Sequence, residues 1–154
     1  MAHEFRLRRS VEFSDTDMAG IMHFAHFFRF MESTEHAFLR SLGFSVHIEE
    51  AGRTIGWPRV HASCDYKQPL RFEDEVEIHL TVREKKTRSL TYDFCFIKET
   101  NGDPPVEVAR GALVVVCASL DATLGRLKAI PIPESIAQLI EAAPAPLAPA
   151  EARE

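Results

Sequence analysis

Two aspartates stand in a short polar segment directly before a stretch with helical spacing. Asp15 and Asp17 belong to the turn-like residues 14–20, and the helical pattern begins at about residue 23. A helix start presents unpaired backbone N–H groups and the positive end of the helix dipole. Such amides can polarise a carbonyl group, while a nearby carboxylate acts as base or nucleophile. The spacing therefore allows two interpretations, a hydrolase site or an aspartate that only caps the turn.

Two histidines and a glutamate of the same region are further candidates. His23 and His26 lie three residues apart and could form a metal site with Asp17, although metal ligands usually come in sets of three or more. Histidines of the surface or the core are the simpler interpretation. Glu35 falls within the apolar stripe of the expected helix, so its carboxylate needs a partner or a raised pKa. Such a residue is catalytic, satisfied within the fold, or placed at a subunit interface.

Basic residues gather at two places in an acidic chain. The net charge of −5 argues against a general binder of nucleic acid or of anionic membranes. One basic group lies at an expected hairpin and the other in a late loop: Lys85, Lys86 and Arg88, then Arg126 and Lys128. Each group could hold phosphates locally, or consist only of solvated charges.

Length and composition indicate a single globular domain. The chain has 154 residues, of which 45% are hydrophobic and 27% are charged. No apolar run approaches the roughly 18 residues of a membrane helix, and the first residues lack the apolar core of a signal peptide. The three cysteines, Cys64, Cys95 and Cys117, show no CxxC spacing and predict neither a disulfide framework nor a zinc site. We expect a cytoplasmic protein without a metal or cofactor.

One long helix and an opening strand are expected around the two aspartates. Residues 5–13 alternate as a half-buried strand, with Arg9 interrupting an apolar face of Phe5, Leu7, Val11 and Phe13. Residues 23–42 follow helical spacing, and Gly43 is placed to cap the C-terminus. The expected buried stripe consists of Phe24, Phe27, Phe28, Met31, Phe38 and Leu42.

The rest of the chain reads mostly as strands. Alternation predicts strands at residues 60–67, 76–83, 90–96 and 106–119, with the last one central because residues 112–118 are apolar on both faces. Hairpin connections are expected at 85–87 and 101–102, and a short helix at 134–141. The Ala/Pro-rich residues 142–154 are expected to be disordered. The fold class is therefore α+β, an antiparallel sheet of about five strands curled around one helix in a domain of residues 1–141.

A set of residues at the turn and the helix resembles the hotdog-fold acyl-CoA thioesterases, of the 4-hydroxybenzoyl-CoA thioesterase and YbgC-like types. The set consists of Phe13-Ser14-Asp15-Thr16-Asp17, Gly20-Ile21, Phe24, Phe27-Phe28 and Glu32. The likeness extends over about residues 5–133 and includes the order of one strand, a long helix and four strands. The Asp-x-Asp-x-x-Gly segment that opens an aromatic-rich helix is fairly specific for this branch.

This resemblance implies a dimer with a continuous sheet, or a tetramer of such dimers, with the site at the dimer interface. It assigns the catalytic carboxylate to Asp17 and the carbonyl-polarising backbone N–H to the region of His23 and Phe24, with Gly20 in the substrate-binding turn. Many relatives carry Tyr or His where this chain has Phe24. The role of a backbone N–H needs no particular side chain.

The resemblance also implies how the substrate is held. CoA phosphates would contact the basic residues Lys86, Arg88, Arg126 and Lys128. Trp57 and Pro58 precede a strand that, in the family, lines the acyl pocket of the partner subunit. The expected substrate is an acyl-CoA or the corresponding acyl-carrier-protein thioester.

The function implied is hydrolysis of the thioester to a free acid and a thiol. Asp17 would attack the carbonyl directly or activate a water molecule. One alternative is a hotdog hydratase or dehydratase with Asp17 and His23 as its pair, although the spacing of six differs from the five of the hydratase motif. The other alternative is an acyl-thioester binding protein without catalysis.

Overall fold

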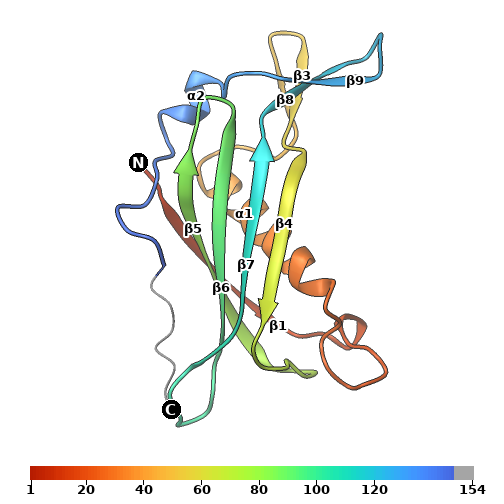
Figure 1. Cartoon of the computed structure of the whole chain (residues 1–154), viewed down its shortest axis with the longest axis vertical. Coiled ribbons are helices and arrows are strands. Elements are labelled where there is room, and N and C mark those ends of the chain that lie inside the picture. The colour runs from red at the N-terminus through yellow and green to blue at the C-terminus, as the bar shows by residue number, and fades with distance from the viewer. Residues whose placement is uncertain (148–154) are drawn as a thin grey trace.

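The chain folds as an antiparallel sheet wrapped around one long helix (Figure 1). This computed structural model describes residues 1–147. The helix is α1 (His26–Ser41), and the sheet contains β1 (Glu4–Ser10), β4 (Arg59–Tyr66), β5 (Glu75–Lys85), β6 (Ser89–Lys98) and β7 (Val106–Val116). The strand order is β1-β5-β6-β7-β4, and every neighbouring pair is antiparallel. The predicted α+β class and five-stranded sheet are confirmed.

Aromatic side chains of α1 fill the concave face of this sheet. The ring of Phe27 lies 5.3 Å from that of Phe96, and the ring of Phe38 lies 6.3 Å from that of Tyr92, measured between centroids. These edge-to-face contacts add to the burial of the rings and fix the helix against β6. The predicted stripe is wrong at one end, because Phe24 is 63% exposed and Phe30 is buried instead.

Helix α1 begins three residues later than the predicted residue 23. The Nδ1 atom of His23 accepts the Ala25 N–H at 3.2 Å, so residues 23–25 form a turn in front of the helix. At the other end Gly43 adopts a φ of +91° and donates its N–H to the Arg40 carbonyl at 3.0 Å. The Phe44 N–H reaches the Leu39 carbonyl at 3.0 Å, which completes a Schellman motif. The predicted C-cap is therefore confirmed.

Strand β1 ends before the predicted residue 13. Phe13 is 78% exposed and starts the short 3-10 helix η1 (Phe13–Asp15), so its predicted place on the apolar face is wrong. Arg9, which interrupts that face, lies with its guanidinium carbon 4.0 Å from the ring centroid of Phe30. It also donates to the hydroxyl of Ser33 at 2.9 Å. A cation–π contact and a hydrogen bond thus join the end of β1 to α1.

A second, smaller sheet lies beyond the end of the first. It contains β2 (Ile48–Glu50), β3 (Arg53–Gly56), β8 (Ala118–Asp121) and β9 (Arg126–Ala129), in the order β2-β3-β8-β9. The predicted single strand 106–119 is wrong, because the chain passes between the sheets at Cys117. The Cys117 N–H donates to the Arg88 carbonyl at 2.8 Å, and its own carbonyl accepts the Ile130 N–H at 2.9 Å. The central strand of the large sheet is β6, whereas β7 is second from an edge.

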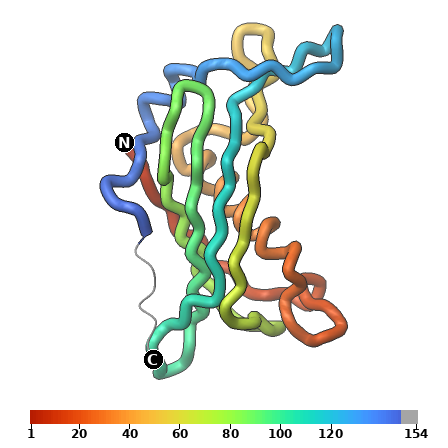
Figure 2. Tube along the Cα trace, viewed as in Figure 1, coloured from red at the N-terminus to blue at the C-terminus, as the bar shows by residue number. Residues whose placement is uncertain are grey.

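The segment after residue 137 runs beside the start of the chain, where Ala2 and Ile140 form a bridge (Figure 2). Helix α2 (Glu134–Ala137) is shorter than the predicted 134–141, and the next residues pair with Ala2. Lys85 donates to the carbonyls of Ala137 and Ile140 at 2.7 Å each, which ties this segment to β5. The Ala143 N–H donates to the Val82 carbonyl at 2.8 Å. Of the expected disordered tail, residues 148–154 lie outside the described residues.

Within residues 1–147, no helix combines the length and apolar character needed to cross a membrane.

Candidate active site

The turn before α1 holds Asp17 in a closed loop. The Asp17 N–H donates to the Ile21 carbonyl, and the Gly20 N–H donates to the Asp17 carbonyl, both at 3.0 Å. Gly20 has a φ of +75°, a conformation that favours glycine and that closes the loop. One carboxylate oxygen of Asp17, Oδ1, accepts the Ala19 N–H at 2.9 Å. Within the described residues Oδ2 has no partner, so Asp17 caps the turn with one oxygen and leaves the other unbonded.

One backbone amide near the helix start has no acceptor. In residues 22–26, four amides are occupied, those of Met22, His23, Ala25 and His26, whose acceptors belong to Leu70, Asp15 and His23. The Phe24 N–H has no acceptor within residues 1–147. Within the predicted region of His23 and Phe24, the N–H group without an acceptor is therefore that of Phe24. An oxyanion site requires such a free amide.

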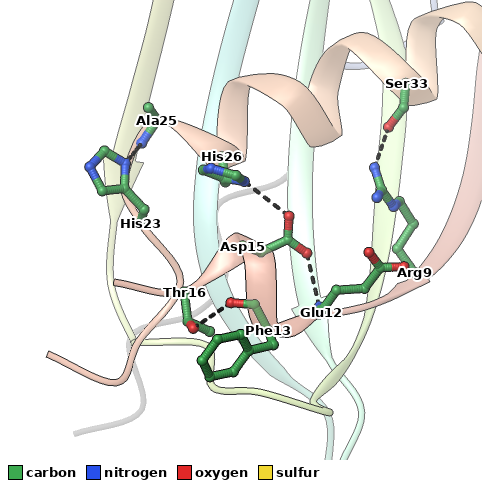
Figure 3. A network of polar contacts seen from close by, with 9 residues as sticks. All are labelled: Arg9, Glu12, Phe13, Asp15, Thr16, His23, Ala25, His26 and Ser33. Atoms are coloured by element: carbon green, nitrogen blue, oxygen red, sulfur yellow. Dashed lines mark hydrogen bonds and ion pairs between the residues drawn. The ribbon is translucent and has the colours of Figure 1, made fainter. Parts of the chain in front are cut away.

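Asp15 differs from Asp17 in having both carboxylate oxygens bonded (Figure 3). Its side chain is buried, with Oδ1 2.9 Å from the Nδ1 of His26 and Oδ2 accepting the Glu12 N–H at 2.9 Å. The Asp15 carbonyl accepts the His23 N–H at 2.8 Å. Asp15 therefore connects η1 to the first residues of α1. Among residues 1–147 no group of three His, Cys, Asp or Glu side chains is arranged to hold a metal ion.

Aromatic rings surround the turn at the surface. The rings of His23 and Phe24 are stacked with centroids 4.6 Å apart, and the hydroxyl of Tyr66 donates to the Phe24 carbonyl at 2.9 Å. Phe13 and Phe72 form an exposed edge-to-face pair with centroids 6.1 Å apart. Phe13, Phe24 and Phe72 thus leave apolar ring surface exposed in the segments around the turn.

The basic residues gather at the opposite end of the fold (Figure 1). Backbone hydrogen bonds from Cys117 to Arg88 and from Ile130 to Cys117 bring the β5–β6 hairpin beside the segment that follows Lys128. Lys86, Arg88, Arg126 and Lys128 are all exposed there, whereas Lys85 is committed to the carbonyls after α2. These bonds place Arg88 beside the end of β9, while Arg126 lies at the far end of that strand. Lys86 forms an ion pair with Glu84 at 3.3 Å, and the bonds of Lys85 remove it from the candidate basic residues, which we call the basic cluster.

Strand β4 separates this cluster from Asp17 within one chain. Its first residue, Arg59, pairs with Val115, and its last, Tyr66, contacts Phe24 beside the turn. The strand has eight residues, which span about 25 Å at about 3.3 Å per residue. Trp57 lies at the far end as well, where it is only 4% exposed.

Glu35 is a buried carboxylate with an arginine partner. Its side chain has 0% exposure, and its Oε2 accepts a hydrogen bond from the Nη2 of Arg59 at 2.8 Å. Arg59 also donates to the Trp57 carbonyl at 2.8 Å. Burial raises the pKa of Glu35 to about 7, although the Arg59 charge lowers it. The expectation that Glu35 needs a partner or a raised pKa is met in both respects.

The cysteines do not supply a nucleophile. All three are free, and burial raises the pKa of Cys64 to about 11, of Cys95 to about 12 and of Cys117 to about 11. Because the thiolate is the reactive form, these thiols are inert at neutral pH. Asp17 keeps a carboxylate oxygen without a partner in the turn that precedes the Phe24 amide, and it remains the candidate for the chemistry.

Two cavities lie among the described residues, away from Asp17. A cavity of about 420 Å³ is lined by Arg9, Asp15, Arg29, Phe30 and Glu32. Another, of about 280 Å³, lies on the outer face of the sheet beside Asp93 and Arg110. Neither of these two is lined by Asp17 or Phe24. Asp17 is half-buried and Phe24 is exposed.

The sheet wrapped around one long helix is the arrangement of hotdog-fold proteins, and the carboxylate and the free amide before the helix make up the candidate site. The family model of the thioesterase-like superfamily matches residues 11–140. The chain therefore belongs to the thioesterase-like superfamily, and the expectation of a thioester hydrolase with the hotdog fold is confirmed.

Curated relatives share about a third of the aligned residues. The chain is 35% identical over 96 residues to a putative esterase of Aquifex aeolicus, an alignment covering 62% of this chain and 73% of the relative. It is 30% identical over 95 residues to a 1,4-dihydroxy-2-naphthoyl-CoA hydrolase of Crocosphaera subtropica, with 62% and 69% covered.

Solved structures have the same fold over most of the chain. A gentisyl-coenzyme A thioesterase matches with a TM-score of 0.70 at 31% identity, covering 86% of this chain and 99% of the other. The 4-hydroxybenzoyl-CoA thioesterase of Pseudomonas sp. strain CBS-3 matches with a TM-score of 0.77 at 21% identity, covering 90% and 99%.

Proposed function

We propose that this protein hydrolyses acyl-CoA thioesters, with Asp17 as the reacting carboxylate and the Phe24 N–H as the oxyanion donor. The observation that carries the proposal is that one short segment, residues 17–24, holds both a carboxylate oxygen and a backbone amide without partners among residues 1–147. Membership of the thioesterase-like superfamily supports the same reaction. Relatives named as naphthoyl-CoA and gentisyl-CoA hydrolases support CoA as the thiol.

The chemistry requires only these two groups because a thioester carbonyl is electrophilic and a thiolate leaves readily. The Phe24 amide would stabilise the negative charge that develops on the carbonyl oxygen. Asp17 would either attack the carbonyl carbon, giving an anhydride that water then hydrolyses, or take a proton from an attacking water. Both routes expel the CoA thiolate and end with a free acid and a regenerated carboxylate.

A panel of acyl-CoA substrates tests this function through the release of free thiol. The panel should contain 1,4-dihydroxy-2-naphthoyl-CoA, gentisyl-CoA and 4-hydroxybenzoyl-CoA beside aliphatic chains of several lengths. Enoyl-CoA hydration, followed in parallel, covers the hydratase alternative. Thiol release with at least one substrate supports the proposal. Hydration without thiol release, or tight binding without turnover, would replace it with one of the two alternatives.

We further propose that the working enzyme is a homodimer or a tetramer of dimers. In one chain the basic cluster and Asp17 lie at opposite ends of β4, and β4 is an edge strand with one side unpaired. A second copy can bring its own basic cluster to the Asp17 of the first. Sedimentation at assay concentrations is expected to show a dimer or larger species. A fully active monomer would contradict this expectation.

Removing a positive charge from the basic cluster is expected to weaken acyl-CoA binding. Lys86→Ala, Arg88→Ala and Lys128→Ala should each raise KM by roughly two- to fivefold, because exposed ion pairs are weak. The kcat value should change little, since the contact is equally strong in the ground and transition states. A pantetheine thioester without the nucleotide serves as the control and should respond to none of the three changes. An unchanged KM for acyl-CoA would assign the phosphate contacts to other residues.

A further inference from the structure

We propose that His26 and Asp15 are positioning residues that hold the Phe24 amide in place for the reaction. This inference rests on the proposed function, because it assigns a purpose to the contacts on either side of the oxyanion donor. His26 is the first residue of α1, and Asp15 is the last residue of η1. Nothing in the motif that identifies Asp17 requires a histidine at position 26.

The two contacts of Asp15 enclose the donor. On one side of Phe24, the His23 N–H donates to the Asp15 carbonyl at 2.8 Å. On the other side, the Nδ1 of His26 lies 2.9 Å from the Asp15 Oδ1, as Figure 3 shows. The buried Asp15 thus binds His23, which directly precedes Phe24, and His26, which lies two residues after it. The Phe24 peptide lies in the short span between two fixed points.

The remaining bonds of Asp15 make it a fixed support. Its second carboxylate oxygen accepts the Glu12 N–H at 2.9 Å, and its side chain has 10% exposure. To accept hydrogen bonds from both Glu12 and His26, the Asp15 carboxylate must keep this one orientation. It also requires the Nδ1 of His26 to carry its proton. Within the described residues the Nε2 of His26 has no hydrogen-bond partner, so the histidine is held through Nδ1 alone.

Further bonds around the same residues leave the Phe24 amide as the free one. The Ala25 N–H donates to the Nδ1 of His23, and the His26 N–H donates to the His23 carbonyl at 2.9 Å. The Phe24 carbonyl is held from outside by the Tyr66 hydroxyl. Because displacement of a catalytic group by about 1 Å can cost on the order of 100-fold in rate, the bonds that orient this peptide matter for kcat.

A matched pair of substitutions at position 26 tests this role. In His26→Asn the amide nitrogen occupies the same place along the side chain as Nδ1 and can donate to Asp15. In His26→Gln the amide nitrogen lies one bond further from the backbone, at the place of Nε2. It therefore no longer stands where Nδ1 contacts Asp15. We expect His26→Gln to lower kcat by about 10- to 100-fold with KM changed by less than about threefold. We expect His26→Asn to recover most of that loss, and His47→Leu, at an exposed loop histidine, to serve as the control.

Binding of two unreactive CoA analogues separates positioning from a general loss of stability. One analogue keeps a carbonyl as a ketone, and the other is a thioether without it. In the parent protein the ketone should bind more tightly, because its oxygen can accept the Phe24 N–H. His26→Gln should reduce this preference by about as much as it reduces kcat, and His26→Asn should restore it. Thermal unfolding of each variant shows whether it is folded at the assay temperature, and His26→Ala, which also removes the donor to Asp15, replaces His26→Gln if that variant is not.

The outcomes of this experiment are distinct. If the parent protein hydrolyses acyl-CoA and a folded His26→Gln variant keeps kcat and the ketone preference, the positioning role is wrong while the proposed function stands. If His26→Asn is as impaired as His26→Gln, the donor at Nδ1 is not the relevant feature, and the inference fails too. If the parent protein releases no thiol from any acyl-CoA, the proposed function fails and this inference fails with it.

Discussion

Asp17→Asn is expected to lower kcat by at least ~100-fold, the scale of one lost general base, and by more if the carboxylate is the nucleophile. The substitution preserves the turn, because the asparagine side-chain oxygen can still accept the Ala19 N–H that Oδ1 accepts now. It removes the free oxygen of the carboxylate as base or nucleophile. KM should change little, since Asp17 is assigned to the chemical step. Steady-state kinetics with the best substrate of the panel measures both constants.

The neighbouring aspartate provides the control for this result. Asp15→Asn keeps one oxygen for His26 but turns an NH₂ group toward the Glu12 N–H, which loses its acceptor. We expect a smaller loss of kcat than at position 17, together with a lower unfolding temperature from the unsatisfied buried groups. A larger loss of kcat at Asp15 than at Asp17, with both variants folded, would transfer the reacting role to Asp15. Near-normal kcat in a folded Asp17→Asn variant would remove Asp17 from the mechanism.

The sequence predicts those parts of the fold that depend on local periodicity. The aromatic residues of α1 recur at helical spacing, and Gly43 is a cap that the sequence displays directly. The predicted helix start is wrong because the ring of His23 accepts a backbone N–H. The spacing of residues in the sequence gives no information about that hydrogen bond. A bond of this kind forms only when the turn and the helix are both in place.

The second sheet is missing from the prediction for a physical reason. The apolar run through Cys117 continues without a break, so alternation cannot show that the chain changes sheets there. The β2–β3 connection is Ala51–Gly52, where Ala51 adopts a φ of +51° without the Asn or Asp that usually marks such a turn. Both features depend on tertiary contacts, and the local composition does not display them.

The sequence predicts which residues form the candidate site, but it does not show which of their atoms have hydrogen-bond partners. Asp15 and Asp17 look equivalent as two aspartates of one turn, but the fold uses both oxygens of the first and one oxygen of the second. The partner of Glu35 is 24 residues away on an edge strand, a distance at which helical or strand periodicity gives no information. The polar nature of position 35 signals that some partner is needed, and the fold supplies Arg59.

The buried position of Glu35 is expected to make the protein less stable as the pH rises from about 5 to about 7. Burial raises the pKa of Glu35 from 4.5 to about 7, so the folded protein holds this proton more tightly than the unfolded chain. Below pH 4.5 both states are protonated and the stability contribution is fully present. Between the two pKa values the unfolded chain releases the proton first, so the free energy of unfolding falls with rising pH. The total loss is on the order of 3 kcal/mol, and it is complete above about pH 7.

Glu35→Gln should remove this pH dependence. The glutamine is neutral at every pH and keeps an oxygen for Arg59, so its free energy of unfolding should vary less between pH 5 and pH 8 than that of the parent. Glu32→Gln is the matched control, because Glu32 lies on the same helix 3.7 Å from Arg59 but its side chain is 55% exposed. Urea unfolding at the two pH values, followed by circular dichroism, measures the difference. An equal pH dependence in the parent and in Glu35→Gln would show that other groups cause it. Loss of the dependence in Glu35→Gln alone would identify this buried carboxylate on α1 as its source, with Arg59 of β4 as the partner that lowers its pKa against the effect of burial.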